Sequence, residues 1–252
     1  MNAPLARDLG CLGCRQPFDL AITMAFQPIV DLAARRVVAH EALVRGRDGA
    51  GAGAVLARVT EDGRFAFDQR CRVAAVSLAA RAGLPGLLHI NFLPNAVYEP
   101  AACLRTTVAA AAEAGWPLDR IVFEVTEGER VADALHLKRV LAAYRAMGLK
   151  TALDDFGAGY AGLNLLADCQ PDILKLDMGL TRAVHGDRAR RAIVRAVAGA
   201  CADLGIEVVA EGVETPEEAV ALRDLGIRLM QGYLFARPLL EAAPEVSWPD
   251  LG

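Results

Sequence analysis

Residues 121–155 read IVFEVTEGERVADALHLKRVLAAYRAMGLKTALDD and contain two strand patterns with a helical pattern between them. The aliphatic runs 121–124 and 150–153 predict strands. Segment 132–147 predicts a helix, and Gly148 suits its C-terminal cap. One face of that helix repeats apolar residues at the i, i+3, i+4, i+7 spacing, namely Leu137, Val140, Leu141 and Tyr144. A strand, a crossover helix and a second strand predict a parallel pair.

The same alternation runs along most of the chain. Strands are predicted at 23–30, 37–43, 87–91, 121–124, 150–153, 173–176, 207–210 and 228–231. Helices are predicted at 67–82, 100–114, 132–147, 188–204 and 216–225. Thr215 and Pro216 suit an N-cap and first helical residue, with Glu217 and Glu218 in the first turn.

The fold class is therefore α/β, and so many strands in so short a chain favour a TIM-like (β/α)8 barrel over an open sheet. The first two strands are joined only by residues 31–36. That connection is too short for a crossover helix, so we expect one antiparallel strand in the barrel. We expect a barrel domain over residues 21–240, an N-terminal tail over 1–20 and a C-terminal tail over 241–252.

Composition excludes several classes of protein. Of 252 residues, 54% are hydrophobic and 23% charged, which excludes a disordered chain. A net charge of −4 disfavours nucleic acid polymers and anionic membranes as partners. We find no apolar run typical of a membrane span or a signal peptide. The six cysteines are scattered and predict no disulfide framework, so we expect a soluble, cytoplasmic protein.

Polar residues stand where the predicted strands end. In a parallel barrel these ends meet at one rim, where the active site is built. The rim candidates are Glu41, Asn91, Glu124, Asp154, Asp155, Lys175, Glu211 and Gln231. Most of them are carboxylates, which repel one another unless cations neutralise them. An oxygen ligand set without His or Cys favours Mg²⁺ or Mn²⁺ over zinc.

The adjacent Asp154 and Asp155 suggest two ions. Two oxygen-ligated ions about 3.5–4 Å apart are the arrangement used for displacement at phosphorus. Lys175 would orient the attacking water and lower its pKa, or else balance the charge of the carboxylates.

Eight short motifs resemble one known family, the EAL-domain cyclic-di-GMP phosphodiesterases, over residues 23–238. They read FQPI (26–29), EALVR (41–45), INF (90–92), FEVTE (123–127), DDFGAGY (154–160), LKLD (174–177), AEGVE (210–214) and QGY (231–233). The resemblance implies a TIM-like barrel with one antiparallel strand. It also implies hydrolysis of cyclic di-GMP to linear pGpG with two Mg²⁺ or Mn²⁺ ions.

The resemblance also implies a role for each candidate residue. Glu41, Asn91, Glu124 and Asp154 would hold one ion, and Asp154 would bridge to a second ion near Asp155. Lys175 would contact the attacking water, and Glu211 would act as general base or position the metal and water. The substrate would meet Gln27, Arg45 and Gln231, while Glu127 and Glu214 would support loops. The resemblance further implies a homodimer, coupled to metal binding by the loop 155–159, and allows an unidentified regulatory protein.

Three questions stay open at this point. A receptor that binds cyclic di-GMP with little turnover is an alternative function, which the intact Glu41 and Lys175 disfavour. Enolase-type proton abstraction by Lys175 is another, which the Asp154–Asp155 pair and Arg45 disfavour. Cys11 and Cys14 form a C-x-x-C pair outside the family pattern. They are tail cysteines without a role, a redox pair, or half of a zinc site that His40, Cys71 or His89 would have to complete.

Overall fold

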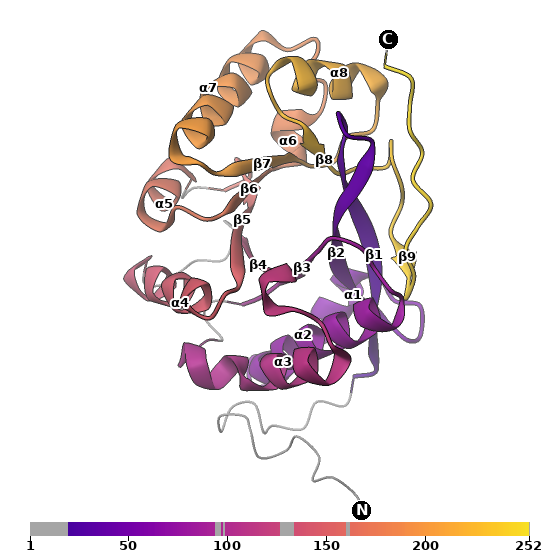
Figure 1. Cartoon of the computed structure of the whole chain (residues 1–252), viewed down its shortest axis with the longest axis vertical. Coiled ribbons are helices and arrows are strands. Elements are labelled where there is room, and N and C mark those ends of the chain that lie inside the picture. The colour runs from indigo at the N-terminus through magenta and orange to yellow at the C-terminus, as the bar shows by residue number, and fades with distance from the viewer. Residues whose placement is uncertain (1–19, 94–96, 98, 127–133, 160–161, 252) are drawn as a thin grey trace, which may run out of the picture.

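The computed structural model describes residues 20–93, 97, 99–126, 134–159 and 162–251, which form a closed barrel of strands surrounded by helices (Figure 1). The strands follow the order β2-β3-β4-β5-β6-β7-β8-β1, and β1 pairs with β2 to close the barrel. The predicted TIM-like barrel is confirmed. Its strands are β1 (Ile22–Asp31), β2 (Arg36–Gly46), β3 (Leu87–Asn91), β4 (Ile121–Thr126), β5 (Lys150–Phe156), β6 (Ile173–Leu176), β7 (Glu207–Ala210) and β8 (Leu229–Met230).

β1 runs against both of its barrel neighbours. It pairs antiparallel with β2 and with β8, whereas the pairings from β2 round to β8 are parallel. The turn between β1 and β2 holds four residues, 32–35, and Arg35 adopts a left-handed backbone with φ of 47°. The predicted antiparallel strand is confirmed. The physical reason is that a four-residue turn can join antiparallel strands but is too short to hold a crossover helix.

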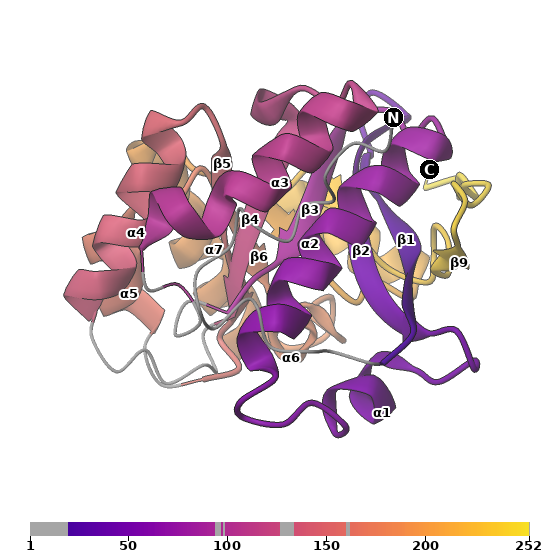
Figure 2. The ribbon, with the colours of Figure 1, turned by 90° about the horizontal axis from the view of Figure 1, so that it is seen from below.

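Within the described ranges, the helices include all those that were predicted and three others. The predicted ones appear as α2 (Arg64–Arg81), α3 (Pro100–Ala114), α4 (Ala134–Ala146), α7 (Arg188–Leu204) and α8 (Pro216–Asp224). Those not predicted are α1 (Ala52–Leu56), α5 (Gly162–Cys169) and α6 (Met178–Thr181), and a 3₁₀ turn covers Leu118–Arg120. Figure 2 shows α1 and α6 at one end of the barrel, where β2 and β6 end.

The barrel interior has an apolar floor below a polar layer. The floor is a buried cluster with one residue from most strands, namely Ile29, Ala39, Val122, Ala152, Ile173, Val209 and Leu229. Side chains two residues apart on a strand share a face. The next inward position is therefore polar on strand after strand: Glu41, Glu124, Asp154, Lys175, Glu211 and Gln231. The apolar floor closes the barrel below these groups.

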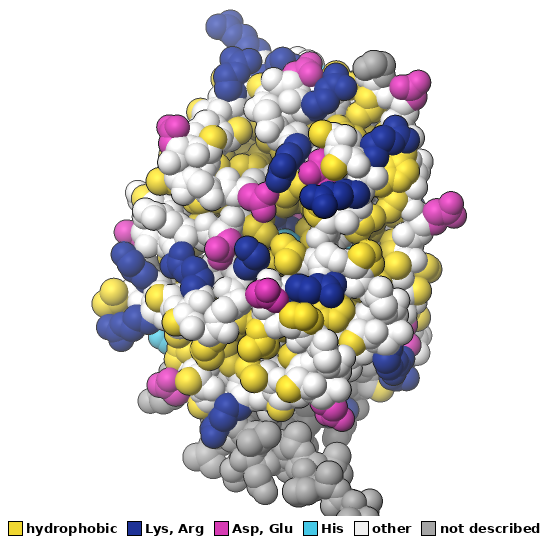
Figure 3. Space-filling view, viewed as in Figure 1, with side chains coloured by type: hydrophobic (Ala, Val, Ile, Leu, Met, Phe, Trp, Pro, Cys, Tyr) yellow, Lys and Arg dark blue, Asp and Glu magenta, His cyan; other side chains and the backbone are white. Residues whose placement is uncertain are grey.

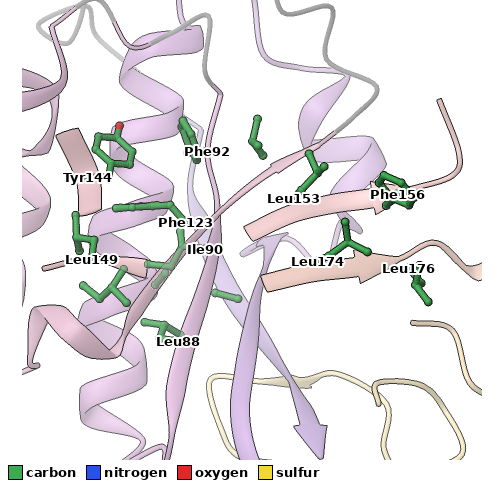
Figure 4. Packing of buried hydrophobic residues seen from close by; sticks show 14 of the residues in the cluster. Leu88, Ile90, Phe92, Phe123, Tyr144, Leu149, Leu153, Phe156, Leu174 and Leu176 are labelled. Atoms are coloured by element: carbon green, nitrogen blue, oxygen red, sulfur yellow. The ribbon is translucent and has the colours of Figure 1, made fainter. Parts of the chain in front are cut away.

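The other face of the strands packs against the helices. On α4 the predicted apolar face is buried, with Leu137, Val140, Leu141 and Tyr144 each at most 1% exposed. Figure 4 shows Tyr144 beside Phe92 and Phe123, and the three ring centroids lie 5.1–5.7 Å apart. Tilted and edge-on ring pairs at this separation add to the stability that apolar burial provides. This packing fixes β3 and β4, which carry two of the polar residues of the mouth.

The C-terminal segment lies along the barrel. A short strand, β9 (Leu239–Leu240), pairs with β1, and Glu241 accepts a hydrogen bond from Thr23. Further on, Val246, Trp248 and Leu251 pack partly buried against the core. Residues 241–251, treated above as a tail, are therefore packed on the domain.

Charges of both signs are interspersed over the face seen in Figure 3. That face has no continuous basic area of the kind that binds phosphate backbones. Among the described residues, no helix combines the length and the apolar character that crossing a membrane requires.

Candidate active site

The structure brings most of the predicted site residues together at the barrel mouth. Glu41 lies on β2, Asn91 ends β3, Glu124 lies on β4, and Lys175 lies on β6. The strands do not all stop at these residues. For example, β2 continues to Gly46, because it pairs with β1 along its whole length. The charged layer therefore sits just inside the mouth, which explains its burial.

Lys175 is at the centre of the cluster and is fully buried. Its Nζ atom lies 2.8 Å from Asp154 Oδ1, 2.8 Å from Glu211 Oε1, 3.0 Å from Glu124 Oε1 and 3.5 Å from Glu41 Oε2. Burial alone would lower the pKa of this lysine, but the surrounding carboxylates outweigh burial and raise its pKa well above the usual value. Lys175 is therefore held as an ammonium ion.

The carboxylates carry more negative charge than one lysine can neutralise. Burial, reinforced by neighbouring carboxylates, raises the pKa of Glu124 and Glu211 well above the usual value, although Lys175 acts in the opposite direction. The pKa of Asp155 is raised to about 6, chiefly by burial and then by Asp154. A bound cation would reverse these shifts by favouring the ionised carboxylates.

Two groups of three carboxylates have the geometry of cation sites. Oxygens of Glu41, Glu124 and Asp154 lie within 4.8 Å of one another, and so do oxygens of Asp154, Asp155 and Glu211. Asp154 belongs to both groups. In addition, Glu124 Oε2 is buried without a hydrogen-bond partner among the described residues. An acceptor of this kind is costly unless a cation binds it, so the donor set fits hard divalent ions.

A backbone irregularity brings Asp154 and Asp155 to the mouth together. Neighbouring residues on a regular strand point to opposite faces. Here the pairing of β5 with β6 shifts register between Leu153 and Phe156, and Asp155 has a left-handed backbone with φ of 54°. Aspartate tolerates this conformation better than most residues. The bulge therefore turns both carboxylates towards one site.

Glu41 is held by two amide side chains, one of which bonds a third amide in turn. Gln231 Nε2 donates to Glu41 Oε2 at 2.7 Å, and Asn91 Nδ2 donates to Glu41 Oε1 at 3.2 Å. Gln27 Oε1 accepts a second bond from Gln231 at 3.3 Å, and its own amide donates to the Ala236 carbonyl. Because the Asn91 amide nitrogen is used in this way, its carbonyl oxygen is the atom left to face a cation. In this structure Gln231 positions Glu41, and Gln27 holds Gln231.

Other predicted residues have different surroundings. Arg45 Nη1 donates to the Val44 carbonyl at 2.8 Å, and no bond within the described part of the chain joins Arg45 to another predicted site residue. Glu214 forms an exposed ion pair with Arg182, just after α6. Glu127, Cys11 and Cys14 lie outside the described residues.

The sequence analysis placed Glu218 in a first helical turn but missed that it holds the loop after Glu211. Its Oε2 accepts from the backbone nitrogens of Glu214 and Thr215, and its Oε1 accepts from that of Ala183. Thr215 completes a capping box at the start of α8, so the predicted N-cap is confirmed. The capping pattern in the sequence indicated Glu218. Its bond to the backbone of Ala183 joins segments far apart in the chain, and the pattern could not reveal that bond.

His89, named above only as a residue that could complete a zinc site, is the second residue whose surroundings were missed. It is buried on β3, and its Nδ1 lies 2.6 Å from Glu124 Oε1. The available signal was its position two residues before Asn91, which places both side chains on the same face of the strand.

A cavity of about 440 Å³ opens beside the carboxylates. Glu41, Asn91, Asp154, Asp155 and Glu211 line its polar side, while Leu43, Val44, Leu56 and Phe67 line an apolar wall. A cleft with an ionic end and an apolar wall suits an organic ligand that carries phosphate. Fold and site together define a TIM-type barrel with a cluster of carboxylates at its mouth that fits divalent cations.

Comparison with known proteins agrees with this class. Residues 19–238 match the family model described as EAL domain. The chain is 35% identical over 228 residues to the blue light- and temperature-regulated antirepressor BluF of Escherichia coli (strain K12), covering 90% of this chain and 56% of BluF. It is 33% identical over 238 residues to cyclic di-GMP phosphodiesterase PA2567 of Pseudomonas aeruginosa, covering 91% and 40% of the two chains. The chain thus spans about half the length of these curated relatives.

Solved structures give the same assignment. A standalone versatile EAL protein from Vibrio cholerae O395, in its c-di-GMP bound form, superposes with a TM-score of 0.89 at 49% identity, covering 92% of this chain and 98% of that one. The manganese/cy-diGMP complex of Klebsiella pneumoniae BlrP1 at pH 6 superposes with a TM-score of 0.85 at 41% identity, covering 90% and 58%. This chain therefore belongs to the EAL domain family, and the resemblance seen in its motifs is confirmed.

Proposed function

We propose that this protein hydrolyses cyclic di-GMP to linear pGpG with two Mg²⁺ or Mn²⁺ ions bound at the barrel mouth. The observation that carries the proposal is the place of Asp154 in two groups of three carboxylates around one buried lysine. Relatives named as cyclic di-GMP phosphodiesterases and neighbours solved with cyclic di-GMP and manganese support the substrate and the cation class.

The two carboxylate groups divide the proposed ligands. Glu41, Asn91, Glu124 and Asp154 would hold one ion, and Asp154, Asp155 and Glu211 the other. Divalent ions here would polarise the phosphodiester and acidify the attacking water. Because a Glu211 oxygen lies within 4.8 Å of the Asp154 and Asp155 oxygens, the geometry supports a metal- or water-positioning role for Glu211 over that of a free general base.

Lys175 would contribute as a fixed positive charge. As an ammonium ion it donates protons to acceptors, so it can orient the attacking water and hold Asp154 and Glu211 in place. A lysine with a raised pKa has no free lone pair with which to abstract a proton. This disfavours the enolase-type alternative.

On the substrate side, the apolar wall near Leu56 and Phe67 would receive part of the nucleotide, and Arg45 would approach the phosphate. In the structure Arg45 donates a hydrogen bond to the Val44 carbonyl, which is a neutral acceptor. A guanidinium group prefers a phosphate oxygen, because charge-assisted pairs are stronger than neutral ones. Gln27 and Gln231 would act chiefly by fixing Glu41.

A receptor function is the second candidate, favoured by the 35% identity to the antirepressor BluF. In a receptor the site would bind cyclic di-GMP and pass the signal to a partner without turnover. The complete set of carboxylates and the buried Lys175 favour hydrolysis, because ligand binding alone does not require this charged cluster.

We also propose a homodimer, with the segment after Asp155 near the interface. Of the leucines on α5, Leu165 and Leu166 are buried in the core, whereas Leu163 is 67% exposed and available for contact. Sedimentation velocity at working concentration should show a dimer. A fully active monomer would contradict this part of the proposal.

Product analysis by chromatography tests the function. Wild type with cyclic di-GMP and Mn²⁺ should yield pGpG, and a chelator should stop the reaction. Ca²⁺ should support turnover poorly, because it is larger and prefers more ligands. Replacing the exposed Glu113 on α3 (Glu113→Ala) provides a control with an acidic residue removed away from the site. Binding of cyclic di-GMP without any product would instead support the receptor.

A further inference from the structure

His89 is a polar side chain buried inside the barrel, beside the carboxylate cluster. The side chain is 1% exposed and shares the inward face of β3 with Asn91. An imidazole in such a place needs a polar partner, because a buried polar group without one is costly. Its partner is Glu124 Oε1, 2.6 Å from Nδ1.

The two oxygens of Glu124 have different surroundings. Oε1 faces both His89 Nδ1 and, at 3.0 Å, Lys175 Nζ. Oε2 is buried and has no hydrogen-bond partner among the described residues. Oε1 therefore has an imidazole and a cation beside it, whereas Oε2 is left free for a ligand.

The direction of the bond to His89 follows from the other groups. A Glu124 carboxylate that holds a cation is ionised, and an ionised carboxylate can only accept hydrogen bonds. At 2.6 Å from Oε1, the Nδ1 atom of His89 is therefore the donor, and the ring carries a proton on Nδ1.

We propose that His89 is a positioning residue that fixes the Glu124 carboxylate and directs Oε2 to a divalent cation. The inference rests on the proposed function, since it concerns how that cation site is built. Residues that hydrogen-bond a ligand orient it and tune its affinity for metal.

His40 shows what a purely structural histidine looks like in this fold. It is equally buried, on β2, but its Nδ1 lies 3.2 Å from the backbone carbonyl of Pro85. It stands next to Glu41 in sequence, so its side chain points to the opposite face of the strand. Replacing His40 removes a buried histidine without touching the cluster, which makes it the matched control.

The first test measures the affinity for Mn²⁺ alone, without nucleotide, by isothermal titration calorimetry. His89→Leu removes the donor, and Mn²⁺ binding should weaken about 10- to 100-fold. His89→Asn keeps an N–H near the position of Nδ1 and should recover most of that loss. His40→Leu should bind Mn²⁺ as wild type does. Thermal unfolding of each variant reports whether it is folded.

The outcomes separate this inference from the proposed function. If wild type binds no Mn²⁺, the cation site itself is wrong. If wild type binds and folded His89→Leu binds equally well, only the role of His89 is wrong. The same conclusion follows if His89→Asn binds no better than His89→Leu.

A second measurement does not depend on the folding of His89→Leu. Nitrogen-15 spectra of histidine-labelled wild type should show a proton on Nδ1 of His89, assigned by the signal that His89→Asn loses. A His89 ring without a proton on Nδ1 at neutral pH would overturn the inference.

Discussion

Replacing Lys175 with methionine tests how the cluster is held together. The change removes a fully buried positive charge that contacts four carboxylates at 2.8–3.5 Å, and leaves those carboxylates facing one another. Removing one partner of a buried ion pair costs about 3–5 kcal/mol. We expect a loss of this size in the free energy of unfolding of the metal-free protein. For a chain of this length, the loss lowers Tm by about 6–20 °C.

The assay is denaturant unfolding in chelator and again with saturating Mn²⁺. Mn²⁺ at about 100 times its Kd should return about 2.7 kcal/mol, because a cation replaces part of the missing charge. Replacing the exposed Lys138 on α4 (Lys138→Met) is the matched control and should change stability by about 0.5 kcal/mol or less. If Lys175→Met loses no more than Lys138→Met, the ion pairs do not hold the cluster together and the reasoning fails.

Three further predictions concern the site, and a fourth concerns the N-terminal segment. Glu41→Gln should lower kcat by at least about 100-fold, because mutating a residue that merely supports a metal ligand already lowers activity about 10- to 100-fold. Steady-state kinetics on a variant with a near-wild-type Tm checks this. Metal-free protein should lose stability as pH rises from about 4 to about 6: the pKa of Asp155 is raised to about 6, so the folded state binds more protons than the unfolded state in this window. Tm measured in chelator should show that slope and Mn²⁺ should flatten it; a rising Tm would contradict the assignment. Glu218→Gln should cost about 1–3 kcal/mol in a denaturant titration, because backbone donors lose a buried acceptor, whereas the exposed Glu217→Gln should cost far less. Cys11→Ser with Cys14→Ser should leave hydrolysis unchanged under reducing conditions, and a large loss would show that the N-terminal segment belongs to the working structure.

The alternation of strands and helices made the barrel predictable. The face of α4 repeats with the period of a helix, and the polar residues of the mouth stand where apolar strand patterns end, so the sequence locates both. Short elements carry too few residues to show a period, which is why α1, α6 and β9 were missed. Helix α5 was missed although it is longer, because two of its leucines pack inward and a third is exposed.

Within the site, the sequence predicted which charged residues gather at the mouth. It did not predict residues that act through a hydrogen-bond partner far away in the chain. Glu41 and Asp154 stand out because charged residues follow apolar runs. The hydrogen bond of His89 is made with Glu124, 35 positions away, and one of those of Glu218 is made with Ala183, also 35 positions away. Such pairings appear only when the chain is folded. The left-handed Asp155 is a backbone feature that no composition pattern reveals.

The most direct test of hydrolysis is a reaction of wild type with cyclic di-GMP and Mn²⁺ in ¹⁸O-labelled water, followed by mass spectrometry of the nucleotide. The proposed displacement by water predicts linear pGpG that carries one solvent oxygen on its terminal phosphate. Recovery of intact cyclic di-GMP from folded, Mn²⁺-loaded protein that binds the nucleotide would contradict the account and leave a receptor in its place.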